Sequence, residues 1–381
     1  YRIEIMIENP FVLRGYVSEE YFCDRRNETS RLSHLIRNGN NVVLISPRRM
    51  GKTGLIRHLY GTRDISREYN TFFVDILHTT SLKEFTFCLS KEIFETLKPA
   101  GKKIIDELLA ILKSLSGKME YNPVTGMPEL AIQLGDIRNP ETTLDQIFKY
   151  LDSSKKPCIM TIDEFQQIRE YKDNVNVEAL LRSLVQKTPN CRFVFSGSHK
   201  HVMSDMFSSS RRPFYNSADI LPLEAIPEEV YAEFASEKFN AFDRMIPETE
   251  IKWVYEQFCG YTYNIQRVMN EVFSSVAPGN MVDHQVVEYA ISDILDSNAT
   301  TYRELLSTLT EKQKQVLVAI AKDINARNLT SEAFVSRHVL PSASAVQNAL
   351  RKLLSDEIVY KEDETYSVYD KFLAMWLRRT F

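Results

Sequence analysis

The strongest constraint on the fold is a short apolar run that leads directly into a glycine–lysine–threonine loop. Residues 42–59 read VVLISPRRMGKTGLIRHL. The apolar run predicts a buried strand, and the segment from Thr53 to Tyr60 predicts a helix. Strand, loop and helix in this order are the setting of the phosphate-binding pattern G-x-x-x-x-G-K-[ST]. The chain matches this pattern except at the first position, where Ser46 replaces glycine.

The residue types in this loop suit the parts of a nucleoside triphosphate. Gly51 lets backbone amides approach phosphates, Lys52 can reach the β- and γ-phosphates, and the Thr53 hydroxyl can bind Mg²⁺. Ser46 costs some backbone freedom but leaves the amides, the lysine and the hydroxyl in place. We therefore predict that ATP or ADP binds here with Mg²⁺; the alternative is a chance G-K-T at a helix start. The predicted nucleotide contacts are Ser46, Pro47, Arg48, Arg49, Met50, Gly51, Lys52, Thr53 and Gly54.

Two acidic residues follow a second apolar run, in CIMTIDEFQQI. An acid at the end of such a strand holds Mg²⁺ in phosphate-loop enzymes, and the acid after it can activate water. We predict Asp163 as a metal ligand and Glu164, with Lys52, as a catalytic residue. The alternative is an Asp–Glu pair that only begins a helix. A third run, CRFVFSGS, ends in small polar residues, and Ser198 is either a sensor of the γ-phosphate or part of a turn.

From Val42 to about Ile220, apolar runs alternate with amphipathic stretches, which predicts a parallel sheet covered on both faces. The expected strands are residues 41–46, 71–76, 129–134, 158–163, 191–197 and 218–223. The expected helices between them include residues 82–97, 143–151 and 177–187. Residues 99–127 are expected to be an insertion, with a helix ending near Gly117 and a turn at 122–126.

Helical patterns dominate after Pro227, and the last stretch changes character again. Expected helices cover residues 227–239, 247–258, 262–276 and 283–296. From about Thr310, three helices and two short β-like runs predict a winged helix-turn-helix, followed by a closing helix. We therefore predict an α/β phosphate-loop core (1–225), an α-helical lid (226–299) and a winged helix domain (300–381).

Composition limits the class of protein. The chain has 381 residues, 44% of them hydrophobic, and a formal net charge of −4, which gives no global signature of polyanion binding. Five scattered cysteines without a C-x-x-C pair favour a reducing cytoplasm over a zinc site or disulfides. The sequence contains neither an apolar run of membrane-spanning length nor a signal-peptide pattern, so we expect a cytoplasmic protein without a membrane partner.

Several motifs together resemble the archaeal-type ATPase family, a branch close to the STAND NTPases within the AAA+ ATPases. The motifs are FCDRRNE (22–28), SPRRMGKTGL (46–55), IDEFQ (162–166), SGS (196–198), RPFYNSADILPL (212–223), GYTYNIQ (260–266) and the terminal YSVYDKFLAMWLRR. The resemblance spans nearly the whole chain. It implies an AAA+-like core, a lid and a winged helix, and it implies that serine is allowed in place of the first loop glycine.

The resemblance also implies roles for residues outside the loop. The family's first motif reads F-x-G-R-x-x-E, so Phe22 and Arg25 become candidates for the adenine side, although Asp24 replaces the glycine. Arg267 stands where AAA+ proteins often carry a sensor arginine, and a surface arginine is the alternative.

Either Arg211 or Arg212 is a candidate arginine finger. Arg48 and Arg49 either strengthen anion binding or pair with an acid.

The winged helix has two possible partners. Its expected recognition helix, residues 342–355, offers Arg351 and Lys352 as DNA-binding candidates. The acidic wing tip, Glu362 to Glu364, would repel phosphates. From residue 300 onward there are 12 Lys and Arg against 10 Asp and Glu, a weak basic footprint. Docking of a protein or of the chain's own core is therefore the alternative.

The sequence supports three hypotheses for function. The first is a slow Mg²⁺-dependent ATPase that acts as a switch, in which ATP between core and lid repositions the winged helix. The second is a DNA-binding regulator in which nucleotide is mainly structural. The third is an interaction scaffold for another protein. The sequence leaves the oligomeric state open.

Overall fold

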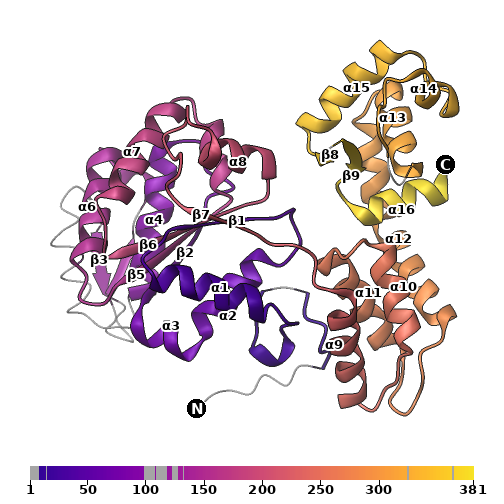
Figure 1. Ribbon diagram of the computed structural model, residues 1–381, viewed down its shortest axis with the longest axis horizontal. Helices are drawn as coiled ribbons and strands as arrows, with labels where there is room; N and C mark the ends of the chain where they lie inside the picture. Colours follow the sequence, from indigo (N-terminus) through magenta and orange to yellow (C-terminus); the bar gives the residue numbers. More distant parts are fainter. Residues whose placement is uncertain are drawn as a thin grey trace. The chain divides into compact units, whose positions relative to one another are not determined.

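The computed structural model describes residues 8–13, 15–97, 108, 118–121, 128–131, 133–323, 326–362 and 364–381. The chain divides into two compact units (Figure 1). One unit comprises residues 14–226, and the other comprises residues 227–381 together with residues 1–13.

The first unit is built on a five-stranded parallel sheet with the strand order β2-β5-β6-β1-β7. Its strands are β1 (Val42–Ile45), β2 (Asn70–Asp75), β5 (Cys158–Asp163), β6 (Cys191–Gly197) and β7 (Asp219–Pro222). Every residue of β1 and β5 is buried, as expected for central strands with helices on both faces. The predicted α/β fold class is therefore confirmed.

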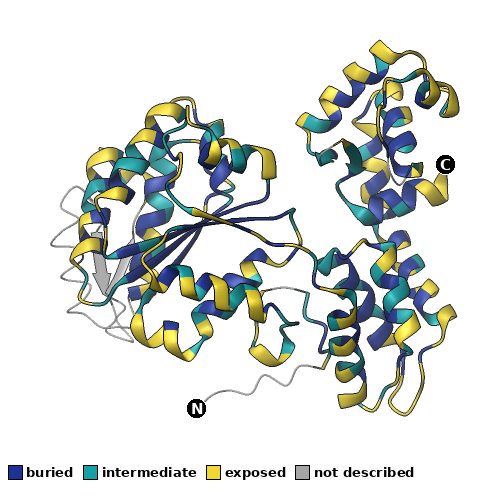
Figure 2. Cartoon of the chain, in the orientation of Figure 1, coloured by how far each residue is buried: buried dark blue, intermediate teal, exposed yellow. Residues whose placement is uncertain are grey.

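Helices cover both faces of this sheet, and alternate residues of β1 show how (Figure 2). Val42 and Leu44 face one cluster with the first three helices, whereas Val43 and Ile45 face the larger cluster with the later ones. The first set is α1 (Arg26–Arg37), α2 (Lys52–Gly61) and α3 (Arg63–Glu68). The second set is α4 (Leu82–Leu97), α6 (Pro140–Ser153), α7 (Asn174–Gln186) and α8 (Lys200–Ser208). Short 3-10 helices are η1 (Glu19–Tyr21), η3 (Leu134–Asp136) and η4 (Phe165–Glu170).

The strand expected at residues 129–134 does not belong to the main sheet, so that prediction is wrong. Instead β4 (Pro128–Ala131) pairs antiparallel with β3 (Lys118–Tyr121). Only residues 122–127 connect the two strands, which is enough for a hairpin, whereas a parallel partner needs a crossover of roughly a dozen residues or more. The helix expected to end near Gly117 and the turn expected at 122–126 lie outside the described residues.

The second unit begins with the helices of the expected lid. They are α9 (Glu228–Ala241), α10 (Glu248–Gln257), α11 (Thr262–Ser275) and α12 (His284–Ser307). Pro227 and Pro247 cap α9 and α10 instead of occupying the expected first helical position. α12 continues past residue 299, so the expected border between lid and winged helix falls inside one continuous helix.

The segment near the N terminus contacts these lid helices. Phe11 is fully buried against Phe239 and Phe273, and the Asn9 amide donates to the Asn270 carbonyl oxygen over 2.8 Å. The sequence had suggested that the core begins at residue 1. The structure instead joins residues 8–13 to the helical unit.

The last part of the second unit is the winged helix. It consists of α13 (Glu311–Lys322), α14 (Glu332–Arg337), α15 (Ala343–Ser355), the hairpin β8 (Val359–Glu362) and β9 (Thr365–Val368), and α16 (Lys371–Thr380). The predicted capping box at Thr310 and Gln313 forms at the start of α13. Within the described part of the chain, no helix is both long and apolar enough to cross a bilayer.

Candidate nucleotide-binding site

The candidate site lies where three neighbouring strands of the parallel sheet end. β6 pairs with β1 on one side and with β5 on the other. The loop after β1, the acidic pair at the end of β5 and the serine after β6 therefore meet at the carboxyl edge of the sheet. This edge is where α/β proteins generally hold their ligands.

The loop conformation explains why Ser46 can replace glycine. Gly51 has φ of 93°, a left-handed conformation that favours glycine, and Arg49 also has a positive φ of 68°. Ser46 is not among the described residues with a positive φ, so its backbone does not require glycine. No side chain caps the N terminus of α2 at Gly51. The first turn of that helix is therefore suited to an anion.

Lys52 is buried at the mouth of this loop. Its Nζ donates to the Ser46 carbonyl oxygen over 2.9 Å and to the Pro47 carbonyl oxygen over 3.2 Å, and it lies 3.4 Å from the Ser46 hydroxyl. Burial lowers the pKa of Lys52, although the carboxylates of Glu164 and Asp163 oppose that shift. The Ser46 hydroxyl, which a glycine would lack, therefore adds a further contact to the lysine.

Thr53 and Asp163 come together across the site. The Thr53 hydroxyl donates to Asp163 Oδ2 over 3.2 Å. Burial raises the pKa of Asp163, and the neighbouring carboxylate of Glu164 adds to the rise. Both side chains present the oxygen donors that Mg²⁺ prefers. In the described part of the chain no cluster of three or more His, Cys, Asp or Glu can hold a metal ion, so a metal here would need phosphate oxygens as well.

Glu164 is held by two neighbours. Its Oε2 accepts hydrogen bonds from the Ser198 hydroxyl over 2.6 Å and from the Gln166 amide over 2.5 Å. Burial by itself would raise the pKa of Glu164, but these hydrogen bonds and the charges of Lys52 and Arg48 outweigh it, so the pKa is lowered. The structure therefore brings the sensor candidate Ser198 into direct contact with the predicted catalytic carboxylate.

Gln166 is the site residue that the sequence interpretation missed. It is 6% exposed, and its amide also donates to the Ser198 hydroxyl over 3.3 Å. Gly197 makes room for it, because a Cβ at that position would lie 2.6 Å from Gln166 Oε1. The IDEFQ motif contained this glutamine, but nothing in its residue type marked it as a partner of Glu164.

Of the adenine-side candidates, Phe22 packs against α2 and Arg25 contacts the loop before it. The Phe22 ring stacks on His58 of α2, and a Cβ on Gly54 would lie 3.2 Å from the Phe22 ring. Arg25 is 2% exposed and donates to the carbonyl oxygens of Met50 and Glu224. Its guanidinium thus ties the loop to the segment after β7, which is a structural role that the motif did not reveal.

Arg48 and Arg49 differ in position within the loop. Arg48 is half-buried, and its positive charge helps to lower the pKa of both Lys52 and Glu164. Arg48 therefore acts electrostatically on the centre of the site. Arg49 is exposed.

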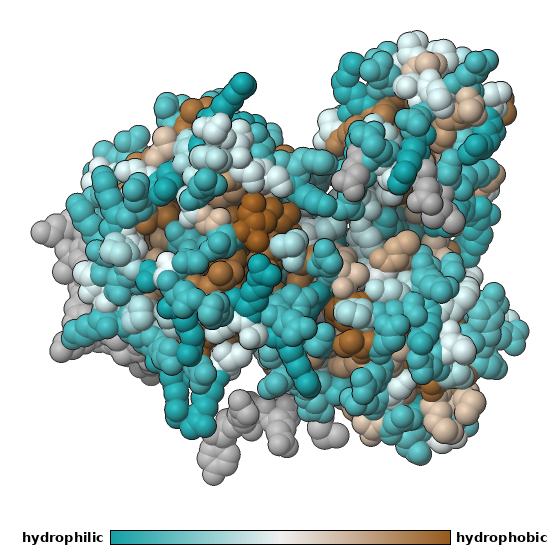
Figure 3. Space-filling model, in the orientation of Figure 1, coloured by the Kyte–Doolittle hydropathy of each residue, from teal (hydrophilic) through white to brown (hydrophobic). Residues whose placement is uncertain are grey.

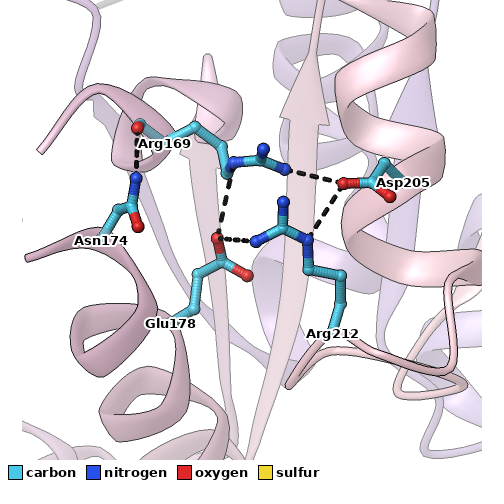
Figure 4. Close-up of polar contacts among 5 residues, drawn as sticks. All are labelled: Arg169, Asn174, Glu178, Asp205 and Arg212. Carbon is cyan, nitrogen blue, oxygen red and sulfur yellow. Dashed lines mark hydrogen bonds and ion pairs between the residues drawn. The ribbon is translucent and has the colours of Figure 1, made fainter.

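Arg212, one of the two arginine-finger candidates, belongs to an ion-pair network within the first unit (Figure 4). Arg212 and Arg169 both bond to Asp205 Oδ2, over 3.0 and 2.8 Å. Both also lie within 4 Å of the fully buried Glu178, at 3.7 and 3.9 Å. Burial raises the pKa of Glu178, and the two guanidiniums oppose that rise. Arg212 therefore links α7 to α8, and Arg169 joins η4 to the same two acids, whereas Arg211 is exposed.

Three further candidates lie in the second unit. Arg267 is on α11 and pairs with Glu271 at 3.5 Å. Arg351 and Lys352 are exposed on α15, where Lys352 Nζ bonds to Asp356 Oδ1 over 2.6 Å. All three residues therefore belong to the unit that does not contain the phosphate loop.

The parallel sheet, the G-K-T loop before α2 and the C-terminal helices and hairpin define a phosphate-loop ATPase with a winged helix domain. The family model of an ATPase domain found predominantly in Archaea matches residues 22–268, and that of a winged helix domain matches residues 300–379. The chain belongs to this archaeal-type ATPase family. The resemblance inferred from the motifs is thus confirmed.

Solved structures show the same fold over nearly the whole chain. The Walker-type ATPase PABY2304 of Pyrococcus abyssi is 20% identical, with 97% of this chain and 99% of that chain covered and a TM-score of 0.63. The ADP form of Aeropyrum pernix ORC2 is 11% identical, with 97% of each chain covered and a TM-score of 0.57. Aeropyrum pernix ORC1 in complex with DNA is 13% identical, with 98% and 97% covered and a TM-score of 0.53. No curated protein sequence matches the chain.

Proposed function

We propose that this protein binds ATP with Mg²⁺ at the loop after β1, hydrolyses it slowly and acts as a nucleotide-controlled switch. The observation that carries the proposal is the convergence of Lys52, Asp163 and Glu164 with the Thr53 hydroxyl, which lies 3.2 Å from Asp163 Oδ2. Five unpaired cysteines, in a chain proposed to use ATP, also fit the proposed cytoplasmic location.

Each residue has a proposed role in this reaction. Lys52 and the amides of the loop bind the phosphates, while Thr53 and Asp163 hold Mg²⁺. When bound, Mg²⁺ would neutralise charge on the phosphate oxygens. Glu164 accepts a proton from the attacking water. Because its pKa is lowered, Glu164 is ionised at neutral pH and can accept that proton.

The switch part of the proposal is supported by contacts between the lid and the winged helix. α12 runs without a break from one to the other. The Tyr261 hydroxyl of the lid lies 2.7 Å from the Tyr360 hydroxyl of the wing, and the rings of Phe258 and Phe372 meet at 4.8 Å. A lid that responds to nucleotide would therefore carry the winged helix with it.

Two substitutions test the site. Lys52→Ala should weaken ATP binding about tenfold to a hundredfold, because it removes charge-assisted hydrogen bonds to phosphate. Glu164→Gln should keep binding but lower kcat by about 10²–10⁴. Isothermal titration and phosphate release measure the two effects, with Lys91→Ala, exposed on α4, as the control. Normal ATP binding by Lys52→Ala would contradict the assignment of the site.

A distance measurement tests the switch separately from the site. One spin label would sit on the first unit and the other on α15. ATP with Mg²⁺ should change the distance distribution in the wild type and leave it unchanged in Lys52→Ala. An unchanged distribution in a wild-type protein that binds ATP would refute the switch but not the nucleotide site.

A second candidate function is DNA binding by the winged helix. The observation in its favour is the exposed polar face of α15, which includes Gln347, Asn348 and Arg351. One structural neighbour, ORC1, was solved in complex with DNA. This function predicts a salt-dependent DNA affinity that does not require Glu164. Equal DNA affinity of the wild type and Arg351→Ala would count against it.

A further inference from the structure

The winged helix carries a groove of about 760 Å³ on a face that does not include α15. The groove is lined by the end of α12, by α13, by the end of α14 and the turn after it, and by the end of α16. Neither α15 nor the β8–β9 hairpin contributes a lining residue. A ligand in this groove and DNA on α15 would therefore contact different residues.

The apolar part of the groove includes the most exposed large hydrophobic side chain described in the chain. Val339 is 86% exposed, and Phe381, also in the groove, is 60% exposed. Hydrophilic side chains cover most of the visible surface of α13–α16 (Figure 3), so such exposed hydrophobic residues stand out. Exposed apolar side chains gathered in one hollow indicate an interaction site.

Val339 is also held in an unfavourable backbone conformation. Its φ is 52°, in the left-handed region that a β-branched side chain rarely adopts. The turn is fixed by a hydrogen bond from the Leu340 amide to the Val335 carbonyl oxygen over 2.9 Å, and Leu340 is buried. The fold therefore accepts backbone strain at a residue whose side chain faces solvent. Such strain collects at functional positions.

The rim of the groove is mainly basic. Its charged lining residues are Arg303, Glu311, Lys314, Lys322 and Arg337, four cations and one acid. Three of the cations already have partners: Lys314 pairs with Glu311 at 3.8 Å, Arg337 pairs with Asp323 at 3.2 Å, and Lys322 Nζ donates to the Phe381 backbone oxygen over 2.8 Å. Arg303 is exposed and forms no ion pair with any residue that the structure describes. Among the lining cations, Arg303 therefore has its positive charge left for a ligand.

We propose that this groove binds an acidic peptide segment of a partner protein, with large apolar side chains against Val339 and Phe381 and a carboxylate at Arg303. Charge complementarity favours an acidic ligand, because the basic rim faces it and like charges are repelled. The exposed apolar floor favours a peptide over DNA, whose backbone presents phosphates. The partner is thus bound through a face other than the one expected to meet DNA.

A display experiment tests the proposal on the full chain. Random short peptides displayed on phage are selected on the immobilised protein, and enriched peptides are labelled for fluorescence anisotropy. Enriched peptides should combine Asp or Glu with Leu, Phe or Trp. Arg303→Glu should weaken their binding about tenfold or more. Arg351→Glu, a matched change on α15, should leave their binding unchanged.

Val339→Asn removes the apolar contact without endangering the fold. Asparagine tolerates a positive φ, so the midpoint of unfolding should not fall, while peptide binding should weaken. The proposal is overturned if no peptide is enriched, if enriched peptides lack an acidic excess, or if neither variant weakens their binding. It is also overturned if Arg303→Glu reduces the affinity for a labelled DNA duplex but not for peptide.

Discussion

The nucleotide site and the exposed face of α15 arrange polar side chains in opposite ways. Lys52, Asp163, Gln166 and Ser198 are each 6% exposed or less and are bonded to other groups of the site. On α15, by contrast, Arg351 is exposed, and Lys352 pairs with Asp356 one turn away. The polar groups of the nucleotide site are therefore buried and bonded within the protein, whereas those of α15 face solvent.

This difference follows from the ligands that the two regions suit. A phosphate group is small, so a few donors must be held at fixed positions, and burial strengthens their electrostatic effect. A nucleic acid or a protein surface is large, and contacts to it tolerate mobile side chains on a rim. Substitutions in the nucleotide site should therefore disturb folding and function together, whereas those on α15 should affect binding alone.

The largest expected effect on stability is that of Gln166→Ala. It removes a hydrogen bond to the ionised Glu164, which contributes about 1.5–3 kcal/mol. Because the folded pKa of Glu164 lies below its unfolded value, its stabilising contribution is complete above the unfolded pKa and is lost as pH falls through the folded pKa. The stability difference from the wild type should therefore be largest at neutral pH and shrink in acid. Urea unfolding across this pH range measures it.

The control for this comparison is Gln167→Ala. Gln167 is the next residue, but its amide donates to the Thr79 carbonyl oxygen over 3.0 Å and not to Glu164. A cavity left by a truncated side chain costs the same at every pH, so it cannot imitate the predicted pH dependence. A pH-independent difference for Gln166→Ala would mean that Gln166 is a packing residue and does not hold the carboxylate.

Some parts of the fold could be predicted from the sequence, and others could not. The five strands of the main sheet and the winged helix followed from periodicity, since buried strands and amphipathic helices each impose a repeat. The β3–β4 hairpin did not, because an apolar run of six residues has the same pattern in a central strand and in a hairpin. The length of the connection, and not the run itself, decided its pairing.

The nucleotide site shows a similar limit. Lys52, Thr53, Asp163 and Glu164 were predictable because fixed spacings after strands place them at one edge of the sheet. The hydrogen bonds from Arg25 to the Met50 and Glu224 carbonyl oxygens and from Gln166 to Glu164 depend on the orientation of side chains in the folded protein. Neither the residue types nor their spacing determines those orientations, so the sequence predicted the chemistry of the site and not its bonding network.

An intermediate effect is expected at the contact between lid and wing. The Tyr360 hydroxyl bonds to Tyr261 over 2.7 Å and to Lys371 Nζ over 3.1 Å. Tyr360→Phe removes both bonds but keeps the ring, and it should destabilise the second unit by about 0.5–1.5 kcal/mol. Urea unfolding measures the loss, with Tyr289→Phe, 67% exposed, as the control. If the two variants have the same free energy of unfolding, this contact between lid and wing does not stabilise the second unit.

The smallest expected effect on stability is that of the double change Arg351→Ala and Lys352→Ala. Both side chains are exposed, and the pair between Lys352 and Asp356 is of the i,i+4 type that contributes little in solvent. The midpoint of unfolding should therefore stay at the wild-type value. If α15 binds phosphates, the same variant should reduce the slope of log affinity for DNA against log salt by about one for each phosphate that is no longer bound. A stable variant with an unchanged slope would show that α15 does not bind DNA. The groove at Val339 would then be the proposed binding face of the winged helix.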